Sequence, residues 1–445
     1  MAAPIISVSG LRGIVGESLT PVVAAEFVAA YAMTRPEGLL LVTRDSRCSG
    51  QMLSQAVSAS LTAVGHDVLE AGIAATPTTG VLIREFQAVG GVQISASHNP
   101  IEYNGLKLFD AAGKVLAANV GEEVLHAYRQ QKVDWSSVDT LGQLNHCEDV
   151  TSTHLDSVLK TVCVERIRAA HFKVLLDANH GAGGLLGRRL LEALNCEVIV
   201  LGEEADGQFA HPPEPTAENL QQVCTSVRQQ GPVIGFCQDP DADRLAVIDE
   251  TGRYLGEEYT LALCLRHVLS QSVGDVVINC ATSMMNQRIA ENYGATLWRT
   301  SVGEANVVGK MQEVNAIFGG EGNGGPIDPR VGYVRDSFVG MAQILDLMAE
   351  HQLPVSQLAD QLPKFEMLKE RVDLHGRDVA TALDSLESRF ADAQADRTDG
   401  LRLTWPDRWL LVRASNTEPI VRLMAESEHP GGARNLCNQA RQAIG

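Results

Sequence analysis

Several features of special protein classes are absent from this sequence of 445 residues. It has no apolar stretch of about 18 residues, the length that a membrane-spanning helix needs, and its first residues lack the basic and apolar regions of a secretion signal. Its formal net charge of −19 argues against a large nucleic-acid footprint. Its nine cysteines are scattered singly, without the close pairs of zinc ribbons. We therefore expect a cytoplasmic protein with reduced thiols that binds neither a membrane nor nucleic acid.

The composition is that of an ordinary globular protein, and the chain is too long for a single hydrophobic core. Hydrophobic residues make up 45% and charged residues 20% of the chain. Short apolar runs alternate with longer amphipathic stretches, which indicates strand-helix-strand units with mostly parallel sheets. The pattern occurs three times, with strands predicted at 39–42, 174–176 and 276–278, followed by helices at 52–64, 185–194 and 286–293.

The last part of the chain follows another pattern. Two predicted strands, 409–412 and 421–424, flank a polar loop and precede a helix, which favours a small α+β domain. The sequence therefore predicts an α/β fold of three similar mixed α/β domains plus a smaller C-terminal α+β domain. The expected domain boundaries are 1–150, 151–253, 254–366 and 367–445.

A hydroxyl-rich hexapeptide, Ser95–Pro100, follows the apolar run 90–94 directly. Pro100 cannot continue a strand ladder, and the proline pushes Asn99 out of the helical region, so we expect Ser97 in an irregular loop at a sheet edge. A hydroxyl held at a strand end can carry a covalent intermediate. The alternative for this hexapeptide alone is an ordinary turn rich in serine and asparagine.

The segment Asp239–Arg244 carries carboxylates at alternate positions, namely Asp239, Asp241 and Asp243. Three such carboxylates can converge on one hard divalent cation, because oxygen ligands suit magnesium or calcium. An EF-hand is excluded, since Arg244 stands where its loop needs glycine and a predicted strand follows. A solvated acidic turn is the remaining alternative.

Two further loops have a composition that suits a phosphorylated sugar. Residues 319–325 are rich in glycine, which lets the backbone approach a ligand, and Glu321 and Asn323 can bind vicinal sugar hydroxyls. No lysine follows these glycines, so the segment is not a nucleotide loop, and a flexible surface loop is the alternative. Residues 413–419 with Arg422 offer two guanidinium groups and several donors for a phosphate, or else form a solvated polar turn.

Taken in this order, the four loops resemble those of the α-D-phosphohexomutase superfamily, which includes phosphoglucosamine mutases, phosphomannomutases and phosphoglucomutases. The resemblance covers nearly the whole chain, because segments 72–77, 211–220 and 299–303 also look like connecting motifs of the family. It implies four domains around a central cleft, each contributing one loop, and a hexose phosphate as substrate. The oligomeric state it implies is a monomer or a homodimer.

The resemblance also implies a role for each site residue. Ser97 is the expected phosphoserine, and it would share one Mg²⁺ with Asp239, Asp241 and Asp243. Lys107 and Arg12 are expected beside the phosphoserine, with Lys107 as the proton carrier. The expected substrate-binding residues are Arg244 beside the metal loop, Glu321 and Asn323 at the sugar, and Arg413, Ser415, Asn416, Thr417 and Arg422 at the substrate's own phosphate.

The implied enzyme is an isomerase that moves phosphate between O6 and O1 of a hexose through a bisphosphate intermediate, with a sugar bisphosphate as activator. Glucosamine 6-phosphate, converted to glucosamine 1-phosphate, is the expected substrate. A phosphomannomutase/phosphoglucomutase is the near alternative, and a phosphosugar sensor or a serine-dependent phosphatase is a remote one.

The chain departs from the commonest family pattern at three positions. Pro240 stands where many members have glycine, and Asn323 where a serine often contacts the sugar. Gly325 stands where a histidine is frequent. That histidine sometimes assists proton transfer in relatives, so here the assistance must come from elsewhere or be absent.

Overall fold

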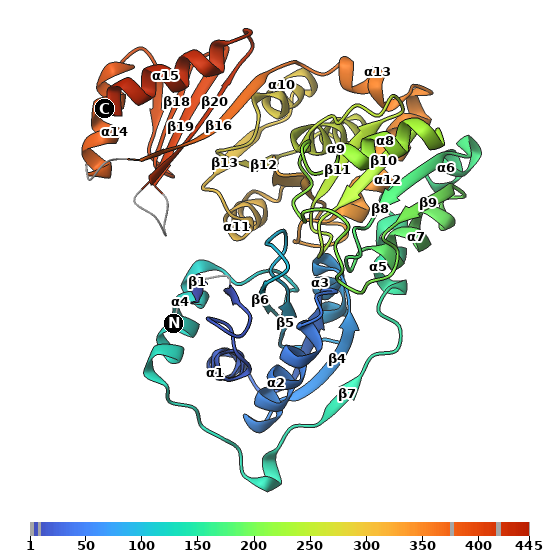
Figure 1. Ribbon diagram of the computed structural model, residues 1–445, viewed down its shortest axis with the longest axis vertical. Coiled ribbons are helices and arrows are strands. Elements are labelled where there is room, and N and C mark those ends of the chain that lie inside the picture. Colours follow the sequence, from blue (N-terminus) through green and yellow to red (C-terminus); the bar gives the residue numbers. More distant parts are fainter. Residues whose placement is uncertain (1–3, 8–9, 374–377, 415–419, 445) are drawn as a thin grey trace. The chain divides into compact units, whose positions relative to one another are not determined.

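The computed structural model describes residues 4–7, 10–373, 378–414 and 420–444 (Figure 1). The chain forms two compact units, and each unit is built from two segments. Unit 1 is Met1–His267 with Asn323–Ala359, and unit 2 is Val268–Gly322 with Asp360–Gly445. Within the described ranges no helix is both long and apolar enough to cross a membrane. The nine cysteines are all free thiols.

Unit 1 begins with a seven-stranded mixed sheet in which β3 pairs in parallel with β4 and β5, and β6 pairs antiparallel with β5 and β2. In spatial order its strands are β1 (Ile5–Ser7), β2 (Gly10–Ile14), β6 (Tyr103–Asp110), β5 (Gly90–Ile94), β3 (Leu39–Arg44), β4 (Asp67–Ile73) and β7 (Leu144–His146). Its helices are α1 (Pro21–Ala32), α2 (Gly50–Ala63), α3 (Thr76–Glu85) and α4 (Ala118–Gln130), followed by the 3₁₀ turn Val138–Thr140.

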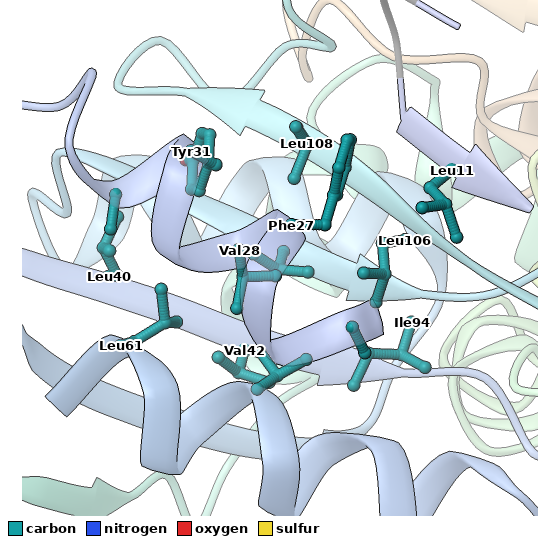
Figure 2. Close-up of a cluster of buried hydrophobic side chains, with 14 of the residues drawn as sticks. Leu11, Phe27, Val28, Tyr31, Leu40, Val42, Leu61, Ile94, Leu106 and Leu108 are labelled. Atoms are coloured by element: carbon teal, nitrogen blue, oxygen red, sulfur yellow. The ribbon is translucent and has the colours of Figure 1, made fainter. Parts of the chain in front are cut away.

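Both faces of this sheet are covered by helices, and the central strand β3 begins with the apolar run Leu39–Val42. Leu40 and Val42 of β3 pack with Phe27 of α1 and Leu61 of α2, as Figure 2 shows. Leu41, between them in sequence, points to the opposite face and packs in a second cluster with residues of α3. Successive strand side chains alternate between faces, so a continuous apolar run requires cover on both sides.

A second sheet of unit 1 carries the loop of three aspartates. Its strands, in order, are β11 (Leu245–Asp249), β10 (Ile234–Gln238), β8 (Lys173–Asp177) and β9 (Glu197–Leu201). β10 and β11 pair antiparallel, and the segment between them is the connecting loop of their hairpin. The other elements are α5 (Ser152–Leu159), α6 (Val164–Ala170), α7 (Gly184–Ala193), α8 (Gln221–Gln230), α9 (Glu257–Gln271), β15 (Gly325–Ile327), α12 (Ser337–His351) and α13 (Val355–Asp360).

Unit 2 contains a parallel sheet and an antiparallel one. In the first, β12 (Val276–Asn279) lies between β13 (Leu297–Thr300) and β14 (Phe318–Glu321), with helices α10 (Met284–Tyr293) and α11 (Glu304–Val314). The second runs β16 (Glu366–Asp373), β20 (Ile420–Ser427), β19 (Arg408–Ala414), β18 (Leu401–Thr404) and β17 (Gln394–Asp396), and helices α14 (Val379–Arg389) and α15 (Gly432–Ile444) pack on its apolar face.

The predicted strand-helix pairs are confirmed as β3 with α2, β8 with α7, and β12 with α10. The two C-terminal strands are confirmed as β19 and β20. The irregular loop expected around Ser97 is confirmed, because β5 ends at Ile94 and residues 95–100 belong to no strand or helix. The strand before it lies in the interior of the sheet, between β6 and β3. Pro100 lies beyond the end of β5, so the ladder does not need the N–H that proline lacks.

Gly90 shows how closely the elements of the first sheet are fitted. The Tyr31 hydroxyl donates a buried hydrogen bond to the carbonyl of Phe109 (2.6 Å). A Cβ at Gly90 would lie 2.1 Å from that hydroxyl oxygen. We expect Gly90→Ala to destabilise unit 1 by about 1–3 kcal/mol, the usual cost of overpacking a core.

Removing the hydroxyl relieves the shortest contact of the extra methyl group, which would still lie 2.8 Å from the carbonyl oxygen of Phe109. Tyr31→Phe alone should cost about 1 kcal/mol through the unpaired carbonyl. The double variant should therefore be less destabilised than the two single changes added together, as measured by calorimetric unfolding. Strict additivity would show that Tyr31 does not set the requirement for glycine.

Candidate active site

Ser97 sits in a backbone conformation that its neighbours hold in place. Its φ is +51°, in the left-handed region that a serine rarely adopts. Its N–H donates to Ser95 Oγ (2.8 Å), and Ser95 Oγ donates to Asp45 Oδ2 (2.7 Å). Strained backbone of this kind persists only where the surroundings determine it, and it concentrates at functional sites.

A single buried guanidinium fixes the rest of this loop. Arg47 Nη2 donates to the carbonyls of Ser97 (2.7 Å) and Asn99 (2.6 Å), and Nη1 donates to those of Pro100 (2.6 Å) and Tyr103 (2.9 Å). The Arg47 side chain is buried, so these bonds exclude water. One side chain thereby pairs with four carbonyls, three in the loop and one at the first residue of β6.

The structure brings Ser97 to the loop of three aspartates. Ser97 Oγ donates to Asp239 Oδ2 at 3.0 Å, although the two residues are 142 positions apart in the chain. Asp239, Asp241 and Asp243 are fully buried, and one carboxylate oxygen of each lies within 4.8 Å of the others. Buried carboxylates at this spacing need compensating cations.

Cations and donors surround this acidic cluster. Lys107 Nζ lies 2.5 Å from Asp241 Oδ2 and 2.9 Å from Asp243 Oδ2. Arg335 Nη2 donates to Asp243 Oδ2 (2.7 Å), and Thr76 Oγ1 donates to Asp241 Oδ2 (2.6 Å). Arg244 Nε lies 3.8 Å from Asp243 Oδ1 and 4.0 Å from Asp239 Oδ2.

The three carboxyl groups differ in their preference for a proton. Burial, together with the charges of Asp241 and Asp243, raises the pKa of Asp239 well above its ordinary value. Burial acts in the same direction on Asp243, but the charges of Arg335 and Lys107 outweigh it and lower the pKa of that carboxyl. Burial lowers the pKa of Lys107, yet Asp241 and Asp243 outweigh it and leave the pKa raised. Lys107 is therefore an ammonium at neutral pH.

The donor set fits a hard divalent cation. Asp241 Oδ1 and Asp243 Oδ1 are buried and have no hydrogen-bond partner in the part of the chain that the structure describes. Unpaired buried carboxylate oxygens are costly, and a metal ion would satisfy them. With Asp239 and the Ser97 hydroxyl they offer only oxygen ligands, which Mg²⁺ and Ca²⁺ prefer. The three aspartates can thus hold a metal ion.

Arg12 and His98 also contact residues of the serine loop. Arg12 Nη1 donates to Asn99 Oδ1 (3.1 Å), and His98 Nδ1 lies 3.2 Å from Ser97 Oγ. Burial, with the charges of Arg244 and Arg12, lowers the pKa of His98 to about 3, so the ring is neutral. No hydrogen bond joins Lys107 to Ser97 within the described ranges, and Lys107 instead contacts the acidic cluster.

In unit 2, Glu321 is the last residue of β14 and its carboxylate is held from two sides. Oε1 accepts hydrogen bonds from Asn279 Nδ2 (2.7 Å) and from the N–H of Gly303 (3.0 Å). Asn323 belongs to unit 1, and its buried Oδ1 has no hydrogen-bond partner among the residues described. Both side chains thus keep polar oxygens in buried positions, which suits contact with a ligand.

Arg413 and Arg422 lie directly opposite each other on β19 and β20. Like charges in such a cross-strand pair are destabilising, so an anion bound between them would be favoured. Arg413 Nε donates to Asp399 Oδ1 (2.7 Å), and Asp399 Oδ2 accepts from the N–H of Val302 (2.8 Å). The expected phosphate contacts Ser415, Asn416 and Thr417 lie outside the described residues.

Sequence patterns missed several residues that hold these groups in place. Asn279 and Arg335 belong to no segment that the sequence singles out. Arg47 lies in the segment 44–47 after a predicted strand, which is not specific by itself, and all three meet their partners only in the folded chain. Thr76 lies in the connecting motif 72–77, which was a usable signal. Asp399 precedes Gly400, whose φ of +77° marks a turn, and an Asp-Gly turn was the available sign there.

Family models match nearly the whole chain in four consecutive pieces. Residues 5–133, 152–252 and 257–365 match alpha/beta/alpha domains I, II and III of the phosphoglucomutase/phosphomannomutase family. Residues 376–443 match the C-terminal domain of the same family. The chain thus has three α/β family domains and a smaller terminal one, in the order that the sequence predicts.

Named relatives agree with these matches. The chain is 36% identical to a phosphoglucomutase/phosphomannomutase of Thermococcus kodakarensis, over 96% of this chain and 95% of that protein. It is 32% identical to a phosphoglucosamine/phosphogalactosamine mutase of Sulfurisphaera tokodaii, over 98% of each. A solved phosphoglucomutase/phosphomannomutase family protein from Burkholderia thailandensis superposes with a TM-score of 0.83 at 26% identity, covering 99% of this chain and 98% of that one. The chain therefore belongs to the phosphoglucomutase/phosphomannomutase family of the α-D-phosphohexomutase superfamily, and it is a phosphohexomutase, an isomerase of hexose phosphates.

Proposed function

We propose that Ser97 is the residue that carries the transferred phosphate. The observation that supports this most is the 3.0 Å hydrogen bond from Ser97 Oγ to Asp239 in the buried acidic cluster. A phosphoryl group on this oxygen would lie beside the three carboxylates that can hold a cation. When bound there, Mg²⁺ would supply positive charge that stabilises the transferring phosphoryl group.

The chain's own residues would then move one phosphoryl group in each half of the reaction. A sugar hydroxyl oxygen attacks the phosphorus of phosphoserine 97, and the bond from phosphorus to Ser97 Oγ breaks. The hydroxyl loses its proton, and the serine oxygen gains one. The bisphosphate then reorients in the site and returns its other phosphate to Ser97 by the reverse of these steps. The phosphate has moved between O6 and O1, and atoms and protons balance.

Lys107 is the proposed proton carrier of these steps. As an ammonium it can give a proton to the serine oxygen when the phosphoryl group leaves, and as the amine it can take the proton of the attacking hydroxyl. Its place on Asp241 and Asp243 keeps it charged between turnovers. Arg12 contacts the serine loop through its hydrogen bond to Asn99. It would bind phosphoryl oxygens without exchanging protons.

The substrate's own phosphate would bind at the opposed arginines of unit 2. Arg413 and Arg422, with Ser415, Asn416 and Thr417, supply the donors for a dianion. Glu321 and Asn323 would bind the sugar hydroxyls, and Arg244 would contact substrate beside the metal loop. We further propose the division into domains 1–150, 151–253, 254–366 and 367–445, each supplying one of the four loops.

Glucosamine 6-phosphate is the proposed substrate, and glucosamine 1-phosphate the product. The similarity to a phosphoglucosamine/phosphogalactosamine mutase supports an amino sugar. The similarity to a phosphoglucomutase/phosphomannomutase favours glucose or mannose phosphates as the second candidate. A sugar bisphosphate is the expected activator, since it would load Ser97 before the first turnover.

Replacing the nucleophile gives the most direct test of this mechanism. Ser97→Ala should abolish turnover, because in the described part of the chain no other hydroxyl is hydrogen-bonded to Asp239. Intact-mass analysis after incubation with a sugar bisphosphate should find one added phosphate on the wild-type chain and none on the variant. Ser385→Ala, on an exposed part of α14, is the matched control and should keep both properties. Normal turnover by Ser97→Ala would contradict the covalent role.

The choice of sugar can be measured directly. A coupled assay with the 6-phosphates of glucosamine, glucose and mannose, with Mg²⁺ and a trace of bisphosphate, should give the highest kcat/KM for glucosamine 6-phosphate. Prior removal of divalent cations with a chelator should abolish all three activities, and added Mg²⁺ should restore them. A higher kcat/KM for glucose or mannose 6-phosphate would favour the second candidate.

Asp399 should affect substrate binding through Arg413. Asp399→Asn keeps the size of the side chain but removes the charge that orients the guanidinium, so KM for the sugar phosphate should rise about tenfold, equivalent to about 1.4 kcal/mol. The rate constant kcat should change little, because the chemistry at Ser97 is untouched. Asp384→Asn, at an exposed ion pair with Arg397, is the control. A fall in kcat with KM unchanged would rule out a role in phosphate binding.

A further inference from the structure

Gly325 is the position where this chain lacks the histidine that is frequent in the family, and the structure shows what fills the space. Gly325 is the buried first residue of β15, and its φ does not lie in the left-handed region, so its backbone does not require glycine. A Cβ there would lie 2.4 Å from Cδ and 2.8 Å from Cγ of Arg335. The glycine is therefore required by the side chain of Arg335, which passes over it.

The guanidinium of Arg335 ends on the acidic cluster. Nη2 donates to Asp243 Oδ2 at 2.7 Å, and the residue is only 8% exposed. The same oxygen accepts from Lys107 Nζ at 2.9 Å. The other oxygen, Oδ1, is buried and has no hydrogen-bond partner in the described part of the chain. Lys107 and Arg335 thus hold Oδ2 of Asp243, and Oδ1 is left for a further ligand.

The backbone that carries Arg335 is itself fixed. The next residue, Asp336, caps helix α12 by accepting from the N–H of Phe338 (2.8 Å). Its own N–H donates to the carbonyl of Pro326 in β15 (2.8 Å), and its Oδ2 lies 2.8 Å from Nε2 of the buried His154. The backbone at Arg335 is therefore held in one position, unlike that of a surface arginine whose side chain exchanges between partners.

We propose that Arg335 is a positioning residue for phosphoryl transfer, which fixes Asp243 and Lys107 from the space left by the missing histidine. This inference rests on the proposed function of Ser97. A guanidinium keeps its proton at all accessible pH values, so Arg335 cannot replace the proton transfer of a histidine. It supplies a permanent charge and a rigid donor instead, and proton transfer is left to Lys107, which shares its carboxylate oxygen.

A double-variant cycle between positions 325 and 335 tests this proposal. Gly325→Ala keeps every charge but pushes the guanidinium away from Asp243, so kcat should fall about tenfold while KM for the sugar phosphate stays within about twofold. Arg335→Ala should lower kcat at least as much. In the Arg335→Ala background, Gly325→Ala should change nothing further, because the side chain it displaces is gone.

A second measurement reports the geometry of the metal site without requiring catalytic turnover. Binding of Mn²⁺ to the unphosphorylated protein, measured by electron paramagnetic resonance, should change about threefold or more on Gly325→Ala in the wild-type background. It should not change on the same substitution in the Arg335→Ala background. Because Gly325→Ala alters no charge, a change in metal affinity reports the position of the guanidinium. A role of Arg335 in folding alone would leave Mn²⁺ binding of the folded Gly325→Ala protein unchanged.

The control is a second arginine of the same segment. Arg330 is half-exposed and pairs with Asp328, so Arg330→Ala should keep wild-type kcat and Mn²⁺ binding. Thermal unfolding checks that each variant is folded. If Arg335→Ala is unfolded, the comparison of kcat and Mn²⁺ binding between Gly325→Ala and the wild type is the test by itself. Additive effects of the two substitutions, or wild-type kcat in Gly325→Ala, would overturn the proposal.

The time course of phosphate loading separates this inference from the proposed function. If Ser97 of the wild-type chain never carries phosphate after incubation with sugar bisphosphate, the proposed function fails. If Ser97 is loaded in the wild type and at the same rate in Gly325→Ala and Arg335→Ala, the proposed function stands and the role of Arg335 fails.

Discussion

Burial of three carboxylates within one hairpin loop is the constraint on which the site depends. Asp239, Asp241 and Asp243 are fully buried and close together, an arrangement that is strongly unfavourable without compensation. The chain compensates with Lys107 and Arg335, and the Ser97 hydroxyl also donates to the cluster. Elements from three separated parts of the chain must therefore fold onto the loop between β10 and β11 before that loop is stable.

Ser97 depends on a similar compensation at the backbone. Carbonyl groups of its loop lie outside any strand. Arg47, whose charge is paired with Asp45 (3.2 Å), donates to three of them and to the carbonyl of Tyr103 in β6. Rigidity follows from this network. The proposed nucleophile is thus held in one position before substrate arrives, and such preorganisation lowers a barrier because no rearrangement is needed in the transition state.

The sequence predicts the parts of this structure that are local. Apolar runs become β3, β8 and β12, and the alternating aspartates fall in the hairpin loop after β10, because strand and turn signals act over a few residues. Arg47, Arg335 and Asn279 could not be found in this way, since an isolated arginine or asparagine has the same local signal whether it is solvated or buried. The interior position of β5 also depends on strand order, which pairing between distant segments decides.

The packing of Arg335 over Gly325 has a consequence for how this sequence can change. With Arg335 in place, any side chain at position 325 meets its methylene groups, so a histidine cannot enter there by one substitution without displacing the guanidinium. Loss of Arg335 first would leave Asp243 with one cation fewer. Either change alone therefore disturbs the acidic cluster, and we expect the pair at 325 and 335 to be inherited as a unit.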